Sequence, residues 1–523
     1  MFKSFGFLLA ALIVLLPIRT SSQTVWFKYA GNPVMDVGVE WESRAAAVTR
    51  VMFEDSLFKM WYIGYDGTAG FLHMVTGYAT SRDGITWTKQ GTQPALSYGP
   101  SLWDGSVASD GYVVRTSTGY NMWYFGQQGS IRRIGYARSP DGILWTKYPN
   151  NPLLDVGPPG TWDERALIYP CVLGPDSVGG YKMWFYGFDG TFGLPQRIGY
   201  ATAVNESTWT KYANNPVLTV GQSGSWDGVH VGYPRVMFED GLYKMWYSGS
   251  TFQSVGYATS PDGINWTKWP ENPVFSGGPI GSWDAVRVHA GDVIPRGGVY
   301  WMWYWGFDGS NFRTGLAVSP KGMTLSISSG QPMIGDTVWV TAEVDSPAGL
   351  SFSAEIRKPE GNIVGTAELH DGGLNGDSVA NDGIFVGNWV PMQTGSYVVD
   401  VKLEIRQQDL SPRFEMKNAM MVSVSTTSVP GAAGPPVNFE LFQNYPNPFN
   451  PTTAISYQLS AVSSVSLKIF DILVREVAVL VNEEVRPGTY ETTWDAAGFP
   501  GGVYLYRLQA GNYSETRKLV LTP

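Results

Sequence analysis

A small set of residues could bind and cleave a substrate, because each departs from a pattern that is otherwise repeated along the chain. The carboxylic acids in this set are Glu42, Asp110 and Glu164. If one carboxyl stays protonated while another is ionised, the pair can act as general acid and as base or nucleophile. Neighbouring arginines would keep one of them ionised. The other members of the set, which could bind a substrate, are Arg165, His230, Arg235, Arg287, His289, Asp292 and Trp305.

The same residues have a structural alternative. The carboxylates could pair with Arg44, Arg165 and Arg287 and seal the centre of the fold. A histidine there could hold water or a metal ion, although a single histidine more often forms hydrogen bonds within a wall. We predict no metal among these residues. An aspartate after a tryptophan recurs in four repeats, which indicates capping or a turn rather than catalysis; these aspartates are Asp104, Asp163, Asp227 and Asp284.

The elements that must position these residues come from a unit of about 60 residues that is written five times. Each copy contains Trp-Asp or Trp-Glu, then Met-Trp, then Gly-Tyr-Ala or a close variant. The clearest copy covers residues 225–274. Alternation and turn residues predict four strands in it, which is typical of a propeller blade; the first ends at 238, and the others cover 243–247, 255–259 and 266–269.

The fifth copy lacks its last strand. It stops at Ser319-Pro320, without the Trp-Thr-Lys and Asn-Pro-Val segments of the other copies. A matching segment stands upstream, from Trp26 to Val34. We therefore predict an all-β chain whose residues 23–323 form a five-bladed β-propeller. The N-terminal strand, residues 25–34, would close the ring and leave no open sheet edge.

Most of the 21 tryptophans occupy repeated positions, which favours packing between blades. Trp269, Trp301 and Trp305 lie outside those positions, so they are better candidates for stacking on a ligand. We interpret the Ser-x-Asp-Gly turns as structural. They resemble the Asp-box turns of sialidase-type propellers and are centred on Asp83, Asp141 and Asp262. The single cysteine, Cys171, excludes an intrachain disulfide and is expected to be a small buried residue.

Composition and the N-terminus limit where the chain acts. Residues 1–22 have one early lysine and an apolar run, which predicts a signal peptide and export. The net charge of −9 is spread along the chain without a basic stripe, so nucleic acid is excluded as a partner. Basic amphipathic helices that would suit a membrane surface are also absent from the sequence. We expect the exported protein to be a monomer.

Two further domains are predicted after the propeller. Residues 324–425 alternate as an Ig-like β-sandwich, and 426–437 form a Ser/Thr/Pro/Gly/Ala linker. Within the sandwich, Asp371, Asp377 and Asp382 stand among glycines and could hold Ca²⁺ through oxygen ligands. Asx-rich turns have the same composition, so that alternative stays open. We expect no other cofactor.

The last 85 or so residues, from 438 to 523, resemble the C-terminal sorting domain of type IX secretion substrates. The run from Tyr445 to Pro451, Tyr-Pro-Asn-Pro-Phe-Asn-Pro, carries this resemblance, together with Gly501-Gly-Val-Tyr-Leu-Tyr-Arg507 and the terminal Arg517-Lys-Leu-Val-Leu521. The resemblance implies recognition by the type IX machinery and passage across an outer membrane, followed by release or attachment at the cell surface.

The propeller resembles the five-bladed glycoside hydrolases, the group with arabinanases, xylosidases, fructosidases and mannoside phosphorylases. The blade count, the closure and the Gly-Tyr-Ala-Thr-Ser-x-Asp-Gly-Ile-x-Trp signature carry the resemblance. It implies cleavage of a polysaccharide or oligosaccharide, with Glu164 as acid and Glu42 or Asp110 opposite. The alternative is a non-catalytic propeller at the cell surface that binds carbohydrate or protein. The regular repeats favour it, as does the absence of the Arg-Asp-Pro and Glu-Cys motifs of the fructosidase branch.

Overall fold

We describe the protein from a computed structural model. It describes residues 25–425 except 39, 69–71, 100–101, 178, 191–194, 251, 329, 374–376, 378 and 407–410. It also describes residues 440–522 except 443, 445–446, 448, 460–462, 472–474, 486–487 and 511–512. The predicted signal peptide and linker lie outside these residues. The described helices are two short 3-10 turns, η1 (Glu40–Glu42) and η2 (Leu102–Asp104), so the predicted all-β class is confirmed. Neither turn is long enough to cross a membrane.

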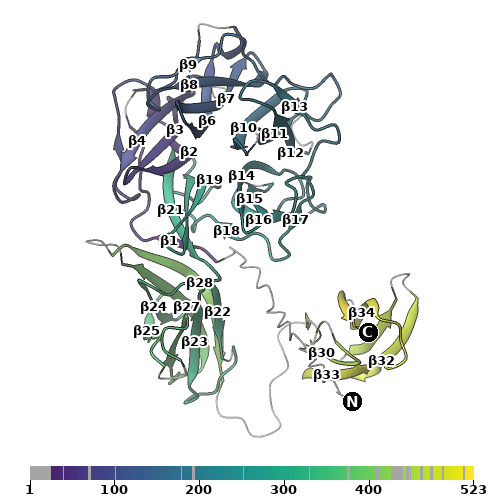
Figure 1. Cartoon of the computed structure of the whole chain (residues 1–523). Coiled ribbons are helices and arrows are strands. Elements are labelled where there is room, and N and C mark those ends of the chain that lie inside the picture. Colours follow the sequence, from purple (N-terminus) through teal and green to yellow (C-terminus); the bar gives the residue numbers. More distant parts are fainter. Residues whose placement is uncertain are drawn as a thin grey trace, which may run out of the picture. The chain divides into compact units, whose positions relative to one another are not determined.

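The chain divides into two compact units, one ending at Val424 and one beginning at Ser425. In the first unit, the repeats fold as antiparallel four-stranded sheets arranged around a centre, which confirms the predicted propeller (Figure 1). The sheet closest to the sequence prediction contains β14 (Gly232–Glu239), β15 (Leu242–Ser248), β16 (Ser254–Ser260) and β17 (Thr267–Lys268). We call each such sheet a blade and number the blades along the chain.

Blade 1 consists of β2 (Ala45–Glu54), β3 (Leu57–Tyr65), β4 (Val75–Ser81) and β5 (Thr88–Lys89). Blade 2 consists of β6 (Val107–Thr116), β7 (Gly119–Gln128), β8 (Ile131–Ser139) and β9 (Thr146–Lys147). Blade 3 consists of β10 (Ala166–Leu173), β11 (Tyr181–Phe188), β12 (Arg197–Ala203) and β13 (Trp209–Lys211). Blade 4 runs from β14 to β17, with the short β18 (Phe275–Ser276) also paired to β16. Blade 5 consists of β19 (Arg287–Arg296), β20 (Val299–Phe307), β21 (Phe312–Pro320) and β1 (Phe27–Tyr29).

The repeated tryptophans lock adjacent blades together. Trp184 of blade 3 is fully buried, and its indole N–H donates to the backbone oxygen of Gly263 in blade 4 at 2.7 Å. Gly263 belongs to a Ser-x-Asp-Gly turn with φ of 80°, where Asp262 accepts the N–H groups of Ile264 and Asn265 at 2.8 Å. The same bond links three other blade pairs: Trp61 to Gly142, Trp303 to Gly84 and Trp123 to Glu206. The repeated tryptophans and these turns therefore act together to join neighbouring blades.

The N-terminal strand β1 completes blade 5. It pairs with β21 on one side, where Phe27 lies opposite Val318. On its other side β1 pairs with β28 (Arg413–Val424) of the next domain, where Lys28 lies opposite Glu415. One continuous sheet therefore runs from the propeller into the sandwich, as the neighbouring β21, β1 and β28 in Figure 1 indicate.

This continuation changes the role predicted for Trp301. The side chain is 1 % exposed and contacts Trp303 and, in the sandwich, Phe414, with ring centroids 5.9 and 6.2 Å apart. Trp301 is thus packed between two domains and is closed to a ligand. Trp269 packs beside the buried cluster that contains Trp26 and Phe275. Trp305, the third proposed stacking residue, lines the cavity at the centre of the propeller.

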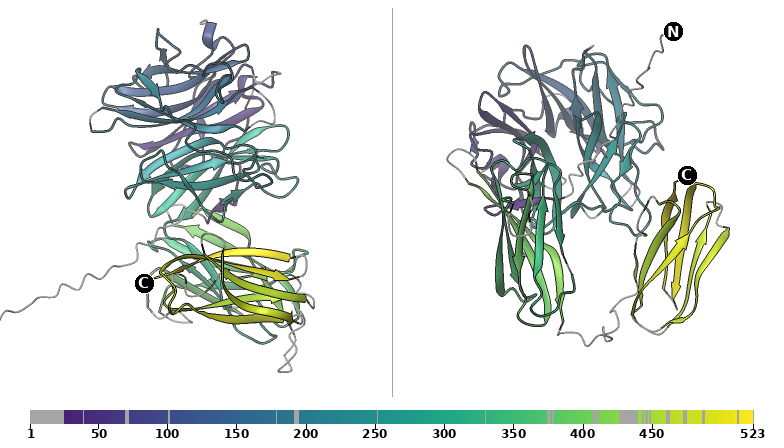
Figure 2. Two further views of the ribbon diagram at one scale, coloured as in Figure 1. Left: turned by 90° about the vertical axis from the view of Figure 1, so that its right-hand side faces the viewer. Right: turned by 60° about the horizontal axis from the view of Figure 1, so that its bottom comes forward.

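The sandwich consists of two sheets with a shared core (Figure 2). One contains β22 (Thr324–Ile327), β23 (Val338–Glu343) and β26 (Ile384–Trp389); the other contains β24 (Leu350–Arg357), β25 (Ile363–Leu369), β27 (Gly395–Ile405) and β28. Asp371 accepts backbone N–H groups from Asp382 and Gly383, each at 3.1 Å. Asp377 accepts the N–H groups of Gly373 and Val379. The described part of the chain contains no group of three or more histidine, cysteine, aspartate or glutamate side chains that could hold a metal ion.

The second unit is a smaller sandwich. One sheet contains β29 (Glu440–Leu441), β30 (Thr452–Leu459) and β33 (Gly488–Asp495). The other contains β31 (Ser463–Phe470), β32 (Glu476–Val485), β34 (Gly502–Ala510) and β35 (Tyr513–Leu521). Its core includes Trp494, Tyr506 and Leu519.

Candidate functional site

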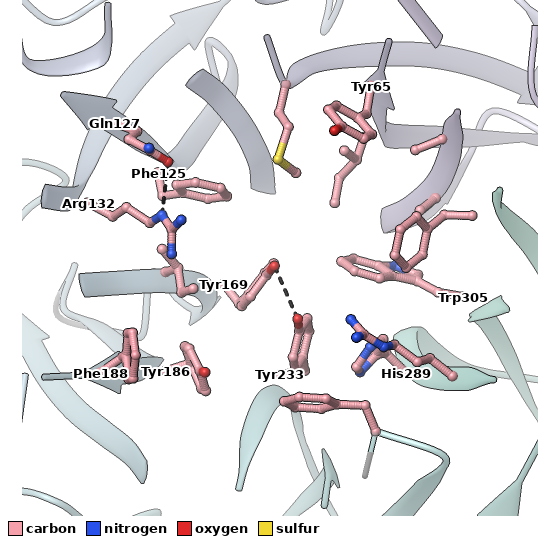
Figure 3. A pocket seen from close by; sticks show the side chains of 18 of the residues that line it. Tyr65, Phe125, Gln127, Arg132, Tyr169, Tyr186, Phe188, Tyr233, His289 and Trp305 are labelled. Carbon is pink, nitrogen blue, oxygen red and sulfur yellow. Dashed lines mark hydrogen bonds between the residues drawn. The ribbon is translucent and has the colours of Figure 1, made fainter. Parts of the chain in front are cut away.

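A pocket of about 250 Å³ opens at the centre of the propeller, where the inner strands of the blades begin (Figure 3). Its walls are mainly aromatic. They come from inner strands and from the ends of second and third strands, so several blades contribute. The aromatic lining residues are Tyr65, Phe125, Tyr169, Tyr186, Phe188, Tyr233, Phe252, Trp305 and Phe312.

The inner strands bring their side chains to the centre through β-bulges. In β6, β10 and β14 the register shifts, and three residues at equivalent positions have positive φ: Asp110 (55°), Tyr169 (54°) and Tyr233 (54°). Bulky residues rarely adopt this conformation, and such strain is concentrated at functional sites. A bulge also redirects a side chain away from the regular alternation. The three bulges therefore define where the pocket floor lies.

Tyr169 and Tyr233 build that floor. Their rings stack with centroids 4.0 Å apart, and the Tyr233 hydroxyl donates to the Tyr169 hydroxyl at 3.2 Å. Figure 3 marks this hydrogen bond with a dashed line. Tyr233 also stacks on His289, with centroids 3.9 Å apart, and Trp305 meets Tyr233 edge-on. Burial keeps both phenols neutral, since it raises the pKa of Tyr233 to about 12 and that of Tyr169 well above its ordinary value. The floor is therefore a stack of three rings, in which Tyr169 and His289 cover the two faces of Tyr233.

A layer of polar residues closes the channel beneath this floor. Each member lies opposite the Met-Trp tryptophan of its blade; the members are Arg50, Tyr112, Cys171, Arg235 and Asp292, and we call them the polar layer. A guanidinium nitrogen of Arg50 lies 2.8 Å from Asp292. The Arg235 guanidinium donates to the backbone oxygen of Gly291. Cys171 is fully buried, accepts the N–H of Val236 at 3.2 Å and has its pKa raised by burial.

The polar layer contains two residues that were predicted from the sequence to bind substrate, Arg235 and Asp292. Both were expected to bind substrate, yet both are almost fully buried below the pocket and have partners within the layer. Arg235 lies two residues after Tyr233 and Asp292 three residues after His289, so both are further along their strands than the residues that line the pocket. They close the channel instead of lining the pocket.

Asp110 is the acidic residue nearest to the floor. It is 1 % exposed, its Oδ1 lies 3.5 Å from the Arg235 guanidinium, and its Oδ2 has no partner among the described residues. Burial raises the Asp110 pKa to about 7, although the adjacent Arg235 charge opposes the shift. Its charge is close enough to raise the pKa values of Tyr169 and Tyr233. Asp110 therefore lies next to the floor without lining the pocket itself.

The structure places Glu42 in a different site from the predicted one. In every blade the acid after the first tryptophan pairs with the lysine of the Trp-x-Lys strand. Glu42 contacts Lys89 at 3.1 Å. The four equivalent pairs are Asp104–Lys147 at 2.5 Å, Asp163–Lys211 at 2.6 Å, Asp227–Lys268 at 2.5 Å and Asp284–Lys28 at 2.6 Å. In blade 1, Glu42 is thus the acid of the ion pair that every blade contains, and it does not line the pocket.

Glu164 is also outside the pocket. It precedes β10, accepts the backbone N–H of Gly160, and lies 3.5 Å from the guanidinium of Arg165. The Arg165 side chain is 48 % exposed and does not line the pocket. The three predicted carboxyls Glu42, Asp110 and Glu164 are therefore not brought together around one cavity.

Three of the predicted substrate-binding residues do line the pocket: Arg287, His289 and Trp305. Nδ1 of His289 lies 2.8 Å from the Ser248 hydroxyl. Burial, and then the charges of Arg287 and Arg235, hold the His289 pKa well below its ordinary value, so the imidazole is neutral. His230 stacks on Phe252 behind the wall, with centroids 5.6 Å apart.

Several lining residues were not predicted. Arg132 projects from β8, and its Nε donates to the side-chain oxygen of Gln127 at 2.9 Å (Figure 3). Gln196 accepts the hydroxyl proton of Tyr186. The sequence repeat could have identified them, because pocket-lining residues recur at two fixed positions of each copy. One position is three residues before the glycine of Gly-Tyr-Ala, and the other is two residues after the tryptophan of Met-Trp. Met74, Arg132, Gln196 and Phe312 share the first position; Ile63, Phe125, Tyr186 and Trp305 share the second.

Family models match the two domains that follow the propeller. Residues 443–522 match the model described as secretion system C-terminal sorting domain. Residues 337–409 match the conditioned medium factor second Ig-like domain. The Ig-like and sorting domains predicted from the sequence are therefore confirmed, and the sorting domain places the protein at the cell surface or outside the cell.

Two curated relatives come from Mycobacterium tuberculosis. The uncharacterized protein Rv1502 is 35 % identical over 161 residues, which cover 30 % of this chain and 50 % of the relative. The uncharacterized protein MT1551, from another strain, is 34 % identical over 161 residues, which again cover 30 % of this chain and 50 % of the relative. The chain thus spans about half the length of these relatives.

The propeller is similar in fold to solved glycoside hydrolases. One, described as a thermostable family-43 glycoside hydrolase, is 17 % identical with a TM-score of 0.43, covering 56 % of this chain and 93 % of the other. A second, from a study of GH130 mannoside phosphorylases and hydrolases that target β-1,2 mannosidic linkages in Candida mannan, is 18 % identical with a TM-score of 0.47, covering 58 % and 95 %. A third is Zg3597, a family 117 glycoside hydrolase of the marine bacterium Zobellia galactanivorans, with 15 % identity, a TM-score of 0.43 and coverage of 57 % and 92 %.

Proposed function

We propose that this exported protein binds the terminal sugar of a glycan in the central pocket of its propeller. One observation carries the proposal: the pocket has a mainly aromatic lining, in which the stack of Tyr169 and Tyr233 meets Trp305, and it has polar groups at its walls. Aromatic faces pack against the C–H faces of sugar rings, and hydroxyl, amide and guanidinium groups bond to sugar hydroxyls. This pattern of apolar surface with a few placed polar groups is typical of small-ligand sites.

The size and closure of the pocket favour a terminal sugar over an internal one. Its volume of about 250 Å³ is below the roughly 300–1,000 Å³ that accommodates drug-sized ligands. The polar layer beneath it prevents a chain from threading through the ring, because Arg50 and Asp292 are paired there at 2.8 Å. A ligand would therefore enter and leave by the same opening.

Binding can be tested on the full exported chain with a glycan array, followed by calorimetric titration of each positive member. We expect Tyr233→Ala to lower the affinity at least about tenfold, because a buried aromatic contact contributes one or more kcal/mol. Tyr148→Ala is a matched control, since Tyr148 packs on Tyr136 away from the pocket. Equal loss in both variants, or unchanged affinity in Tyr233→Ala, would contradict binding at this site.

The second candidate is cleavage of a glycoside, and Asp110 favours it. With a pKa of about 7, this carboxyl is largely protonated below neutral pH and could act as a general acid. Two-carboxyl hydrolysis needs a second acid about 5–10 Å away, and the lining residues of the pocket include no aspartate or glutamate. For this reason binding is proposed first.

Sugar release from a plant and algal polysaccharide panel separates the two candidates. A hydrolase using Asp110 should lose at least about a hundredfold in rate on Asp110→Asn substitution. If the wild-type chain binds members of the panel and releases no sugar from them, the binding function stands alone.

A further inference from the structure

We infer that the glycan recognised in the pocket is acidic, bearing a carboxylate or sulfate on the sugar that enters it. This inference rests on the proposed glycan-binding function and narrows its ligand class. Two arginines, Arg132 of blade 2 and Arg287 of blade 5, reach the pocket from blades that are not adjacent. They are its only charged lining residues within the described structure.

Neither guanidinium has a carboxylate partner among the described residues. Arg132 donates to the neutral side chain of Gln127, and its sequence neighbour Arg133 faces the other way and pairs with Asp155 at 2.6 Å. Of these adjacent residues, Arg133 outside the pocket has a carboxylate partner, whereas Arg132 in the pocket has only the neutral amide of Gln127. The propeller residues outside the described set, at 39, 69–71, 100–101, 178, 191–194 and 251, include no aspartate or glutamate by sequence.

Arg287 is held by aromatic rings. Its guanidinium carbon lies 5.7 Å from the ring centroids of both Phe252 and Phe307. Contacts of this kind use the face of the guanidinium and leave its N–H donors for another acceptor. No hydrogen bond from the Arg287 side chain to a described residue is present. The aromatic wall therefore orients this charge without neutralising it.

The surroundings do not compensate the two positive charges. His289 is neutral, Tyr169 and Tyr233 are neutral phenols, and Asp110 lies behind the floor beside Arg235. Unpaired charges next to apolar walls are unfavourable, and an anionic ligand relieves this by accepting charge-assisted hydrogen bonds. A carboxylate has two coplanar oxygens, and a sulfate ester has three terminal oxygens on a tetrahedral sulfur. Either group can accept two parallel N–H bonds from one guanidinium.

The test uses the full exported chain and an array of matched oligosaccharides in neutral, uronic-acid and sulfated forms. We expect at least about tenfold tighter binding of an acidic member than of its neutral counterpart, and weaker binding at high salt. Arg132→Gln and Arg287→Gln should each remove most of that preference. Arg133→Gln is the matched control and should retain it, because the Arg133 charge lies outside the pocket.

The outcomes separate this inference from the proposed function. Binding of neutral and acidic members with equal affinity, abolished by Tyr233→Ala, would overturn the acidic ligand and leave glycan binding intact. An acidic preference that survives in both pocket arginine variants would also overturn it. Binding of no member would overturn both proposals. A preference confined to uronic acids or to sulfated sugars would support the inference and identify the acid. Thermal unfolding of each variant shows whether it is folded.

Discussion

Replacing Asp110 with asparagine should change how the stability of the propeller depends on pH. The folded-state pKa of Asp110 is raised to about 7 from an ordinary 3.8, so between these values the folded state binds a proton that the unfolded state has lost. Stability therefore falls as pH rises through this window, by about 1.4 kcal/mol per pH unit. Between pH 5 and pH 8 the wild type should lose about 2.5 kcal/mol that Asp110→Asn retains.

Denaturant unfolding followed by tryptophan fluorescence, at several pH values from about 5 to 8, measures this difference. Asp262→Asn is a suitable control. Backbone N–H groups, that of Asn265 first, lower the Asp262 pKa, so its charge does not change in this range and its effect on stability should be constant. If the difference between the wild type and Asp110→Asn is also constant from pH 5 to 8, the assignment of a protonated Asp110 is wrong.

Three further predictions concern the architecture. Lys147→Met leaves the fully buried Asp104 without its ion-pair partner and should lower the free energy of unfolding by about 3 kcal/mol. Arg138→Met removes an exposed ion pair with a 4.0 Å separation and should change the free energy of unfolding by less than about 1 kcal/mol. Chemical denaturation of the two variants compares these effects. Trp301→Ala should lower stability by about 3–5 kcal/mol and expose the sandwich to protease, which limited digestion detects. Deleting residues 25–34 leaves β21 and β28 with open edges, so we expect oligomers in size-exclusion chromatography, and a monomeric product would contradict this.

The blades and their closure could be predicted because each depends on local pattern. Met-Trp and Gly-Tyr-Ala repeat with the strands, and the missing segment of the fifth copy stands at Trp26–Val34. The sheet that joins β1 to β28 could not be predicted, because nothing repeated marks the sandwich strand that lies beside Lys28. Pairing between segments so far apart in sequence depends on the packing of Phe27 and Phe352, which only the folded chain brings together.

Some of the residues proposed from the sequence line the pocket and others do not. Arg287, His289 and Trp305 line it, and all three break the repeat at the inner end of blade 5. Glu42 also breaks the repeat, yet it lies outside the pocket lining. The lysine of the Trp-x-Lys strand repeats with it, which indicates an ion pair. The roles of Tyr169 and Asp110 follow from bulges with positive φ, a backbone feature that residue types alone do not show.

The position of β1 between β21 and β28 also sets an order in time. The first strand of the propeller finds its partners only after Pro320 and then Val424 have been synthesised. Contacts between such distant segments slow folding, because a long loop must close before they form. Blades 1 to 4 contain all of their own strands, so only the last blade has to wait for β1 to meet its partners. The strand that is made first is therefore among the last to be placed.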